Sequence, residues 1–164
     1  MMKRAPWFQL LISLGIAFLA AGMGSLFTTP NLEPWYSQLE KPWFNPPNWI
    51  FGPVWTTLFI LMAVAAWLVW QHGQTKKKKL TPPAAFGLKL YAVQLGLNVL
   101  WSGLFFGLQS PQLALVEVFI FWLVIIATAR EFWRVKPLAG ALFIPYIAWV
   151  SFASVLNYAV VLLN

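Results

Sequence analysis

The second apolar segment of this chain reads PVWTTLFILMAVAAWLVWQ at residues 53–71 and contains no charged side chain. About 20 consecutive apolar residues suffice to cross the hydrocarbon core of a bilayer as an α-helix. Across the whole chain 60% of residues are hydrophobic and only 9% are charged, whereas soluble domains carry roughly 25% charged residues. Segment and composition together predict an integral membrane protein.

Four other segments of similar character lie at residues 8–27, 89–108, 112–133 and 138–163, with breaks near Pro111 and Pro137. Five crossings and their connections leave no room for a separate soluble domain within 164 residues. We therefore expect one transmembrane domain over residues 1–164, an all-α bundle of five membrane-spanning helices.

The first segment follows Lys3 and Arg4, so it also fits a signal peptide. Its full spanning length, and the small residues Ala17, Ala21 and Ser25 at every fourth position, favour a tightly packed membrane helix.

Residues 28–51 form the one long connection that the sequence predicts, because prolines at 30, 34, 42, 46 and 47 break any helical period. Trp35, Tyr36, Trp43 and Trp49 lie within it. Such amphipathic rings suit the headgroup level of a membrane, so this connection is either an aromatic belt or a lid over a cavity.

Basic residues predict the orientation of the bundle. If the N-terminus is cytoplasmic, ten of the 11 basic residues lie inside and only Lys41 lies outside. Because Lys and Arg concentrate on the cytoplasmic side of membrane proteins, this asymmetry supports five crossings with the proline-rich connection outside. A bacterial cytoplasmic membrane is the expected location. The net charge of +7 is thereby explained without nucleic-acid binding.

Several kinds of catalytic site are excluded by composition. The chain has no cysteine and a single histidine, His72. Thiolate chemistry, a multi-histidine metal site and a Ser/His/Asp set therefore have no candidates, and we expect neither a metal nor a required cofactor. Glu117 lies inside the fourth segment, where it is either a structural carboxylate or a group that acts on a ligand or proton.

The third segment has two distinct faces at 100° per residue. One carries Tyr91, Gln94, Asn98, Trp101 and Phe105. Because an unpaired amide in hydrocarbon costs several kcal/mol, this face should point into the bundle or at a ligand. The opposite face carries Gly96, Gly103 and Gly107, which permit close approach of another helix, either of the same chain or of a second copy.

Two other segments repeat the aromatic pattern. One face of the fifth segment carries Tyr146, Trp149, Ala153 and Asn157, and one face of the second carries Trp55, Phe59, Met62 and Ala66. Each face alone is compatible with ordinary packing. Together, the three faces predict an aromatic-lined pocket between the helices.

Three motifs resemble those of the tryptophan-rich sensory protein and translocator protein family, also called the peripheral-type benzodiazepine receptor family. The long connection carries Trp35-Tyr36-x-x-Leu39-x-Lys41-Pro42 and then Pro46-Pro47-x-Trp49-x-Phe51-x-Pro53-Val54-Trp55. The third segment carries Gln94-Leu95-x-Leu97-Asn98 with Trp101-Ser102, and the fifth carries Pro145-Tyr146-x-Ala148-Trp149-x-x-Phe152-Ala153-x-x-Leu156-Asn157.

The resemblance implies a five-helix bundle, usually dimeric, that binds porphyrins such as protoporphyrin IX in a pocket near the long connection. Carried onto this chain, it implies that the ligand-binding residues are Tyr36, Trp49, Trp55, Asn98, Trp101, Trp149 and Ala153. The sterol-recognition pattern of animal members is incomplete here, because no basic residue follows Tyr158. This departure argues against sterol transport.

Three functions remain open at this point. The first is a tetrapyrrole-binding sensor, transporter or regulator of porphyrin levels. The second is an enzyme-like photo-oxidative degradation of porphyrin that uses Trp55 and Trp149. The third is a non-catalytic, dimeric interaction protein whose glycine face joins two copies.

Overall fold

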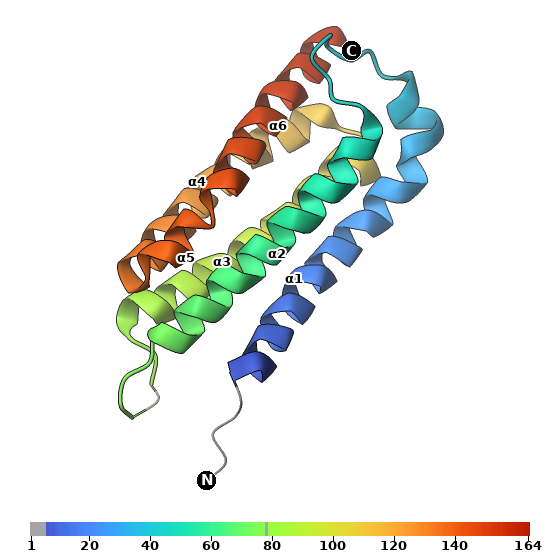
Figure 1. The fold of residues 1–164 in the computed structure, drawn as a ribbon. Coiled ribbons are helices and arrows are strands. Elements are labelled where there is room, and N and C mark those ends of the chain that lie inside the picture. Colours follow the sequence, from blue (N-terminus) through green and yellow to red (C-terminus); the bar gives the residue numbers. More distant parts are fainter. Residues whose placement is uncertain (1–5, 78) are drawn as a thin grey trace.

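Five stretches of helix in the computed structural model are long and apolar enough to cross a membrane. The structure describes residues 6–77 and 79–164, and within them the all-α prediction is confirmed, with only an isolated β-bridge between Gln74 and Leu80. The helices, shown in Figure 1, are α1 (Pro6–Thr28), α2 (Asn48–His72), α3 (Pro82–Ser102), α4 (Pro111–Val135), the short α5 (Pro137–Ala141) and α6 (Ile144–Leu163).

Two helices begin earlier than the sequence suggested. The sequence placed the starts of these two spans near Pro53 and Lys89, but α2 begins at Asn48 and α3 at Pro82. Pro82 occupies the first turn of α3, where a backbone N–H has no helical partner to lose. Pro53 lies in the second turn of α2, so it removes only one hydrogen bond of that helix.

The connection after α1 is shorter than expected. Helical turns at Thr29–Asn31 and Leu32–Tyr36 prolong α1 and helical backbone continues to residue 38, so the irregular part covers only residues 39–47, here called the strap. Asn164, the residue after α6, binds the strap at Glu40. The Asn164 side chain accepts from Glu40 N at 3.0 Å and donates to Glu40 O at 3.0 Å.

The basic residues and the strap lie at opposite ends of the bundle. Lys76, Lys77 and Lys79 lie between α2 and α3, and Arg134 and Lys136 lie at the end of α4. The strap with Lys41 lies at the other end of the bundle, near the C-terminus (Figure 1). Lys3, Arg4 and Lys78 of the predicted inner set lie outside the described residues. We call the two ends the basic end and the strap end.

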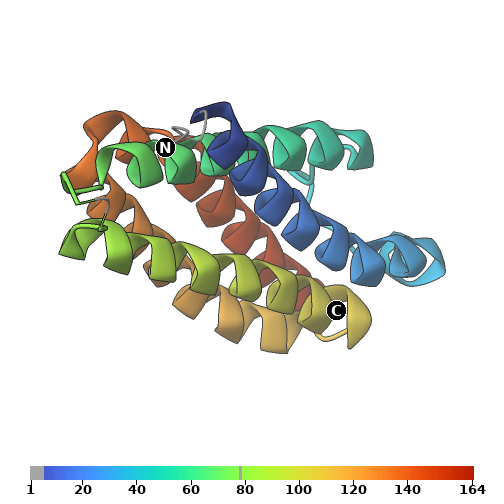
Figure 2. The ribbon, with the colours of Figure 1, turned by 90° about the horizontal axis from the view of Figure 1, so that it is seen from below.

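Small residues set how closely α1 approaches the bundle. Ser13 and Ala17 are buried in the half of α1 nearest the basic end, and Ala20 is buried just beyond the middle of the helix. Near the basic end, Gln71 of α2 also donates a hydrogen bond to Gln9. Towards its C-terminal end, α1 crosses away from α2, as the view from below shows (Figure 2). Small residues thus allow α1 to pack closely on the bundle near the basic end, whereas α1 and α2 splay apart towards the strap end.

Candidate ligand-binding cavity

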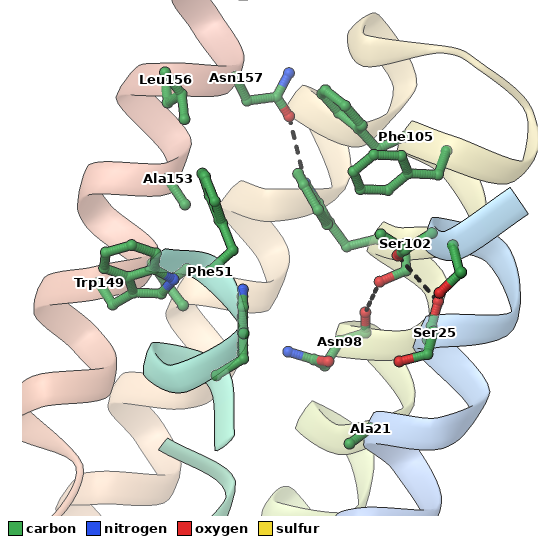
Figure 3. A pocket seen from close by; sticks show the side chains of 18 of the residues that line it. Ala21, Ser25, Phe51, Asn98, Ser102, Phe105, Trp149, Ala153, Leu156 and Asn157 are labelled. Atoms are coloured by element: carbon green, nitrogen blue, oxygen red, sulfur yellow. Dashed lines mark hydrogen bonds between the residues drawn. The ribbon is translucent and has the colours of Figure 1, made fainter. Parts of the chain in front are cut away.

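A cavity of about 410 Å³ lies between the splayed halves of the helices, on the side of the strap end. This volume falls within the range of small-molecule sites in proteins. Residues from α1, α2, α3, α4, α6 and the turns after α1 and α3 line the cavity. Figure 3 shows side chains from α1, α3 and α6 facing a common space.

Six of the seven predicted ligand-binding residues line this cavity, namely Tyr36, Trp55, Asn98, Trp101, Trp149 and Ala153. Trp49 is not among the lining residues, and 74% of its surface is exposed. It occupies the first turn of α2, six residues before Trp55, so the two side chains lie about 120° apart around the helix. The structure therefore does not bring Trp49 together with the other six residues.

Helix α1 contributes to the wall, which the sequence did not indicate. The small residues Ala17, Ala21 and Ser25 were interpreted as packing residues, and Ala17 is indeed fully buried. Ala21 and Ser25, however, line the cavity, with Phe18 and Thr28 beside them. The spacing of these small residues was the only feature of the sequence that bore on this point. Such spacing is compatible with close helix packing and equally with the wall of a cavity.

A hydrogen-bonded network lies beneath the floor of the cavity, towards the basic end, and reaches the cavity through Asn98. The hydroxyl of Tyr146 donates to Gln94 Oε1 at 2.9 Å and accepts from Asn98 Nδ2 at 3.3 Å. Gln94 Nε2 also contacts Met62 Sδ at 3.6 Å. Gln94 and Tyr146 are fully buried. The network gives the amides of Gln94 and Asn98 partners inside the bundle. These amides were predicted to face inward because an unpaired amide in hydrocarbon is costly.

The wall towards the strap end is aromatic and fixed by an amide. The ring of Trp101 stacks on Phe105, with centroids 4.9 Å apart and planes 19° apart. Trp101 Nε1 donates to Asn157 Oδ1 at 3.3 Å, and Asn157 Nδ2 donates to the carbonyl oxygen of Pro111 at 2.9 Å. Asn157 therefore joins α3, α4 and α6 and sets the position of the indole (Figure 3).

The two indoles from α2 and α6 complete the wall. The Trp149 ring packs edge-on against Phe51 at 5.8 Å, and the Trp55 ring against Tyr146 at 6.2 Å, centroid to centroid. Trp149 Nε1 is buried, and none of the described residues accepts a hydrogen bond from it. Because buried N–H groups are normally paired, this unpaired donor is unusual within the wall of the cavity.

The residues just before the strap close the cavity at that end. Tyr36 is buried, and its ring lies 5.5 Å from that of Phe106 and 6.4 Å from that of Phe105. The ammonium of Lys41 lies 4.6 Å from the centre of the Tyr36 ring, a cation–π contact. Tyr36 thus covers this end of the cavity as a lid would, whereas Trp43 and Trp49 are exposed, as rings of an aromatic belt would be.

The glycine face of the third span is divided between two environments. A Cβ atom built on Gly107 would lie 3.0 Å from the Phe27 ring, and one on Gly103 would lie 3.8 Å from it. Both glycines therefore pack against α1 of the same chain. A Cβ atom on Gly96 would meet nothing within 4 Å. Of the three glycines of the predicted dimer face, Gly96 is the one that contacts no other helix among the described residues.

Glu117 is buried in α4 but does not line the cavity. Neither of its carboxylate oxygens has a hydrogen-bond partner among the described residues. The other buried carboxylate, Glu131, pairs with Arg134 at 3.1 Å near the basic end. The described part of the chain holds no group of three metal-ligating side chains.

Five spans among the described residues, with an aromatic-walled cavity between them, define a multi-pass integral membrane protein. The family model described as the TspO/MBR family matches residues 11–163. The chain is 40% identical over 150 residues to the tryptophan-rich protein TspO of Archaeoglobus fulgidus, covering 91% of this chain and 93% of that one. It is 41% identical to the protein of the same name from Chlorobaculum tepidum, covering 94% and 95%. It is also 38% identical to the human translocator protein, covering 87% and 82%. The chain belongs to the TspO/MBR family.

Proposed function

We propose that this protein binds a tetrapyrrole such as protoporphyrin IX in the cavity, and that it senses or regulates porphyrin in the membrane or carries it. The observation that supports this most directly is the gathering of three indoles, from α2, α3 and α6, around one cavity in the apolar part of the bundle. Indole rings offer large flat surfaces to an apolar macrocycle.

The polar groups of the cavity suit a ligand with a few acceptors at its edge. Trp149 Nε1 is an unpaired donor, and Asn98 lines the floor with its amide. A small number of placed polar groups within an apolar wall is the usual means by which such pockets orient a ligand. The names of relatives, a tryptophan-rich sensory protein in Cereibacter sphaeroides and translocator proteins in animals, are compatible with either sensing or transport.

The closed floor bears on the choice between sensing and transport. A ligand that crossed the bundle would have to part the buried contacts of Tyr146 with Gln94 and Asn98. Between this network and the basic end, the bundle is filled by large buried side chains such as Phe132 and Phe143. We therefore favour binding and regulation over transport of the ligand through the bundle.

Titration with protoporphyrin IX tests the proposal. Purified protein in detergent should show saturable quenching of tryptophan fluorescence. Replacing Trp55 and Trp149 together by phenylalanine should weaken binding about five- to hundredfold, because each aromatic pair contributes about 0.5–1.5 kcal/mol beyond its buried area.

The matched control replaces Trp43 and Trp133 by phenylalanine, since both are exposed and neither lines the cavity. It should bind as the unmodified protein does. Equal affinity of the Trp55/Trp149 variant and the control would show that the ligand lies elsewhere.

Photo-oxidative degradation of the porphyrin is the second candidate function. It is favoured by the position of Trp55 and Trp149, the two predicted reactive indoles, on walls of the same cavity. Illumination of the complex in air should then bleach the porphyrin spectrum faster than in the double phenylalanine variant loaded to the same occupancy. A stable spectrum, or equal bleaching in both proteins, would exclude this activity.

A further inference from the structure

The residues that line the cavity differ in exposure according to the helix that carries them. All of the exposed lining residues belong to α1 and the turns that prolong it, or to α2: Phe18, Ser25, Thr29, Leu32, Asn48, Gly52 and Thr56. The lining residues of α3, α4 and α6 are buried or half-buried. The cavity is therefore open on one side, between the splayed halves of α1 and α2.

This opening lies at the depth of the membrane-spanning helices. Phe18, Ser25 and Thr56 belong to the spans Trp7–Tyr36 and Asn48–His72, at positions between their ends. Phe18 is 42% exposed, and its exposed neighbours on α1 are the apolar Leu19 and Leu26. A bundle embedded by these spans turns its opening towards lipid chains rather than towards water.

Contacts close the cavity on its sides away from α1 and α2, while the opening itself continues to the strap end at Thr29 and Asn48. At the strap end, Tyr36 packs on Phe105 and Phe106. At the floor, the Tyr146 network separates the cavity from the basic half. Between α2 and α6, the Phe51–Trp149 ring contact separates the cavity from a shallow apolar groove on the outer surface.

We infer that the ligand enters and leaves sideways, from the hydrocarbon of the bilayer, through the opening between α1 and α2. This inference rests on the proposed binding of an apolar ligand. The ligand then comes from the pool that is dissolved in the membrane. The mouth presents no charged side chain, and the hydroxyl of Thr56 is already bonded to the carbonyl of Gly52 at 2.9 Å. An apolar ligand thus passes without displacing an ion pair.

Two adjacent threonines of α2 provide a matched test. Thr56 lines the opening, and Thr57 lines the outer groove between α2 and α6. Both are exposed, and each hydroxyl donates to the carbonyl four residues earlier at 2.9 Å. Thr56→Phe and Thr57→Phe therefore make the same chemical change in the same helix. The first narrows the opening between α1 and α2, and the second narrows the outer groove between α2 and α6.

The experiment uses full-length protein in phosphatidylcholine nanodiscs that contain protoporphyrin IX, with entry and exit followed by stopped-flow tryptophan quenching. Thr56→Phe should lower the association and dissociation rates together by about tenfold, which corresponds to about 1.4 kcal/mol added to the barrier. The dissociation constant should stay within about twofold, because a barrier raised equally in both directions leaves the equilibrium unchanged. Thr57→Phe should leave both rates unchanged.

Other outcomes would overturn the inference. Slower exchange in Thr57→Phe alone would place the entrance between α2 and α6, and unchanged exchange in both variants would place it under the strap. Weaker binding with faster dissociation in Thr56→Phe would make Thr56 a wall contact. Ser25→Phe narrows the same opening from α1 and decides the case if Thr56→Phe does not fold. Absence of saturable binding in the unmodified protein would instead refute the proposed function.

Discussion

Replacing Tyr146 by phenylalanine removes one oxygen atom from the centre of the bundle. That hydroxyl is the donor to Gln94 Oε1 at 2.9 Å and the acceptor of Asn98 Nδ2 at 3.3 Å. Gln94 is fully buried, so its oxygen has no route to water. Asn98 lines the cavity and can turn its amide towards that space. The main cost of the substitution is therefore the stranded oxygen of Gln94.

The size of the effect follows from these contacts. A buried polar group left without its partner costs about 1–3 kcal/mol in soluble proteins. Interhelical hydrogen bonds measured in a membrane protein average about 0.6 kcal/mol. With one amide stranded and one able to turn, we expect Tyr146→Phe to lower the free energy of unfolding by about 1–3 kcal/mol.

Tyr91→Phe is the matched control. The hydroxyl of Tyr91 is also buried, but it has no hydrogen-bond partner among the described residues. Its removal should leave the free energy of unfolding unchanged or raise it slightly, because an unsatisfied polar group disappears. Unfolding by SDS in mixed micelles, followed by circular dichroism, measures both variants under the same conditions.

A double variant separates the hydrogen bond from the packing. In Gln94→Leu with Tyr146→Phe both partners are apolar, so this protein should be more stable than the sum of the single losses predicts. Equal losses in Tyr146→Phe and Tyr91→Phe, or strict additivity in the double variant, would refute the reasoning that this network stabilises the fold.

Two further substitutions test the strap end and the glycine face. Asn157→Leu removes the acceptor of the Trp101 indole N–H, so it should lower the free energy of unfolding by about 1–3 kcal/mol and weaken porphyrin binding; unchanged binding in the titration would show that the indole position does not matter. Gly107→Ile should destabilise the bundle by about 1–3 kcal/mol in the SDS assay, because its side chain meets Phe27. Gly96→Ile should leave the stability unchanged, and it should abolish chemical crosslinking of two copies if α3 forms a homodimer there; equal stability loss at both glycines would contradict this division.

The sequence by itself determined the membrane-spanning character of this protein. Runs of apolar residues such as 53–71 identify spans locally, since the bilayer thickness sets the required length. The inward face of the third span was also predictable, because amides such as Gln94 and Asn98 are too costly to expose to lipid. Helix starts were less predictable, since a proline such as Pro82 begins a helix as readily as it ends one.

Only the tertiary structure decided which residues surround the cavity and where it opens. Trp49 and Trp55 look equivalent in the sequence, but one ring is exposed and the other lines the cavity. Ala17 and Ser25 share a small-residue pattern, but one is packed and the other lies at the opening. The physical reason is that apolar content is a local property of each segment. The angle at which α1 leaves α2 depends instead on side chains that meet across helices, and no periodicity within one segment records it.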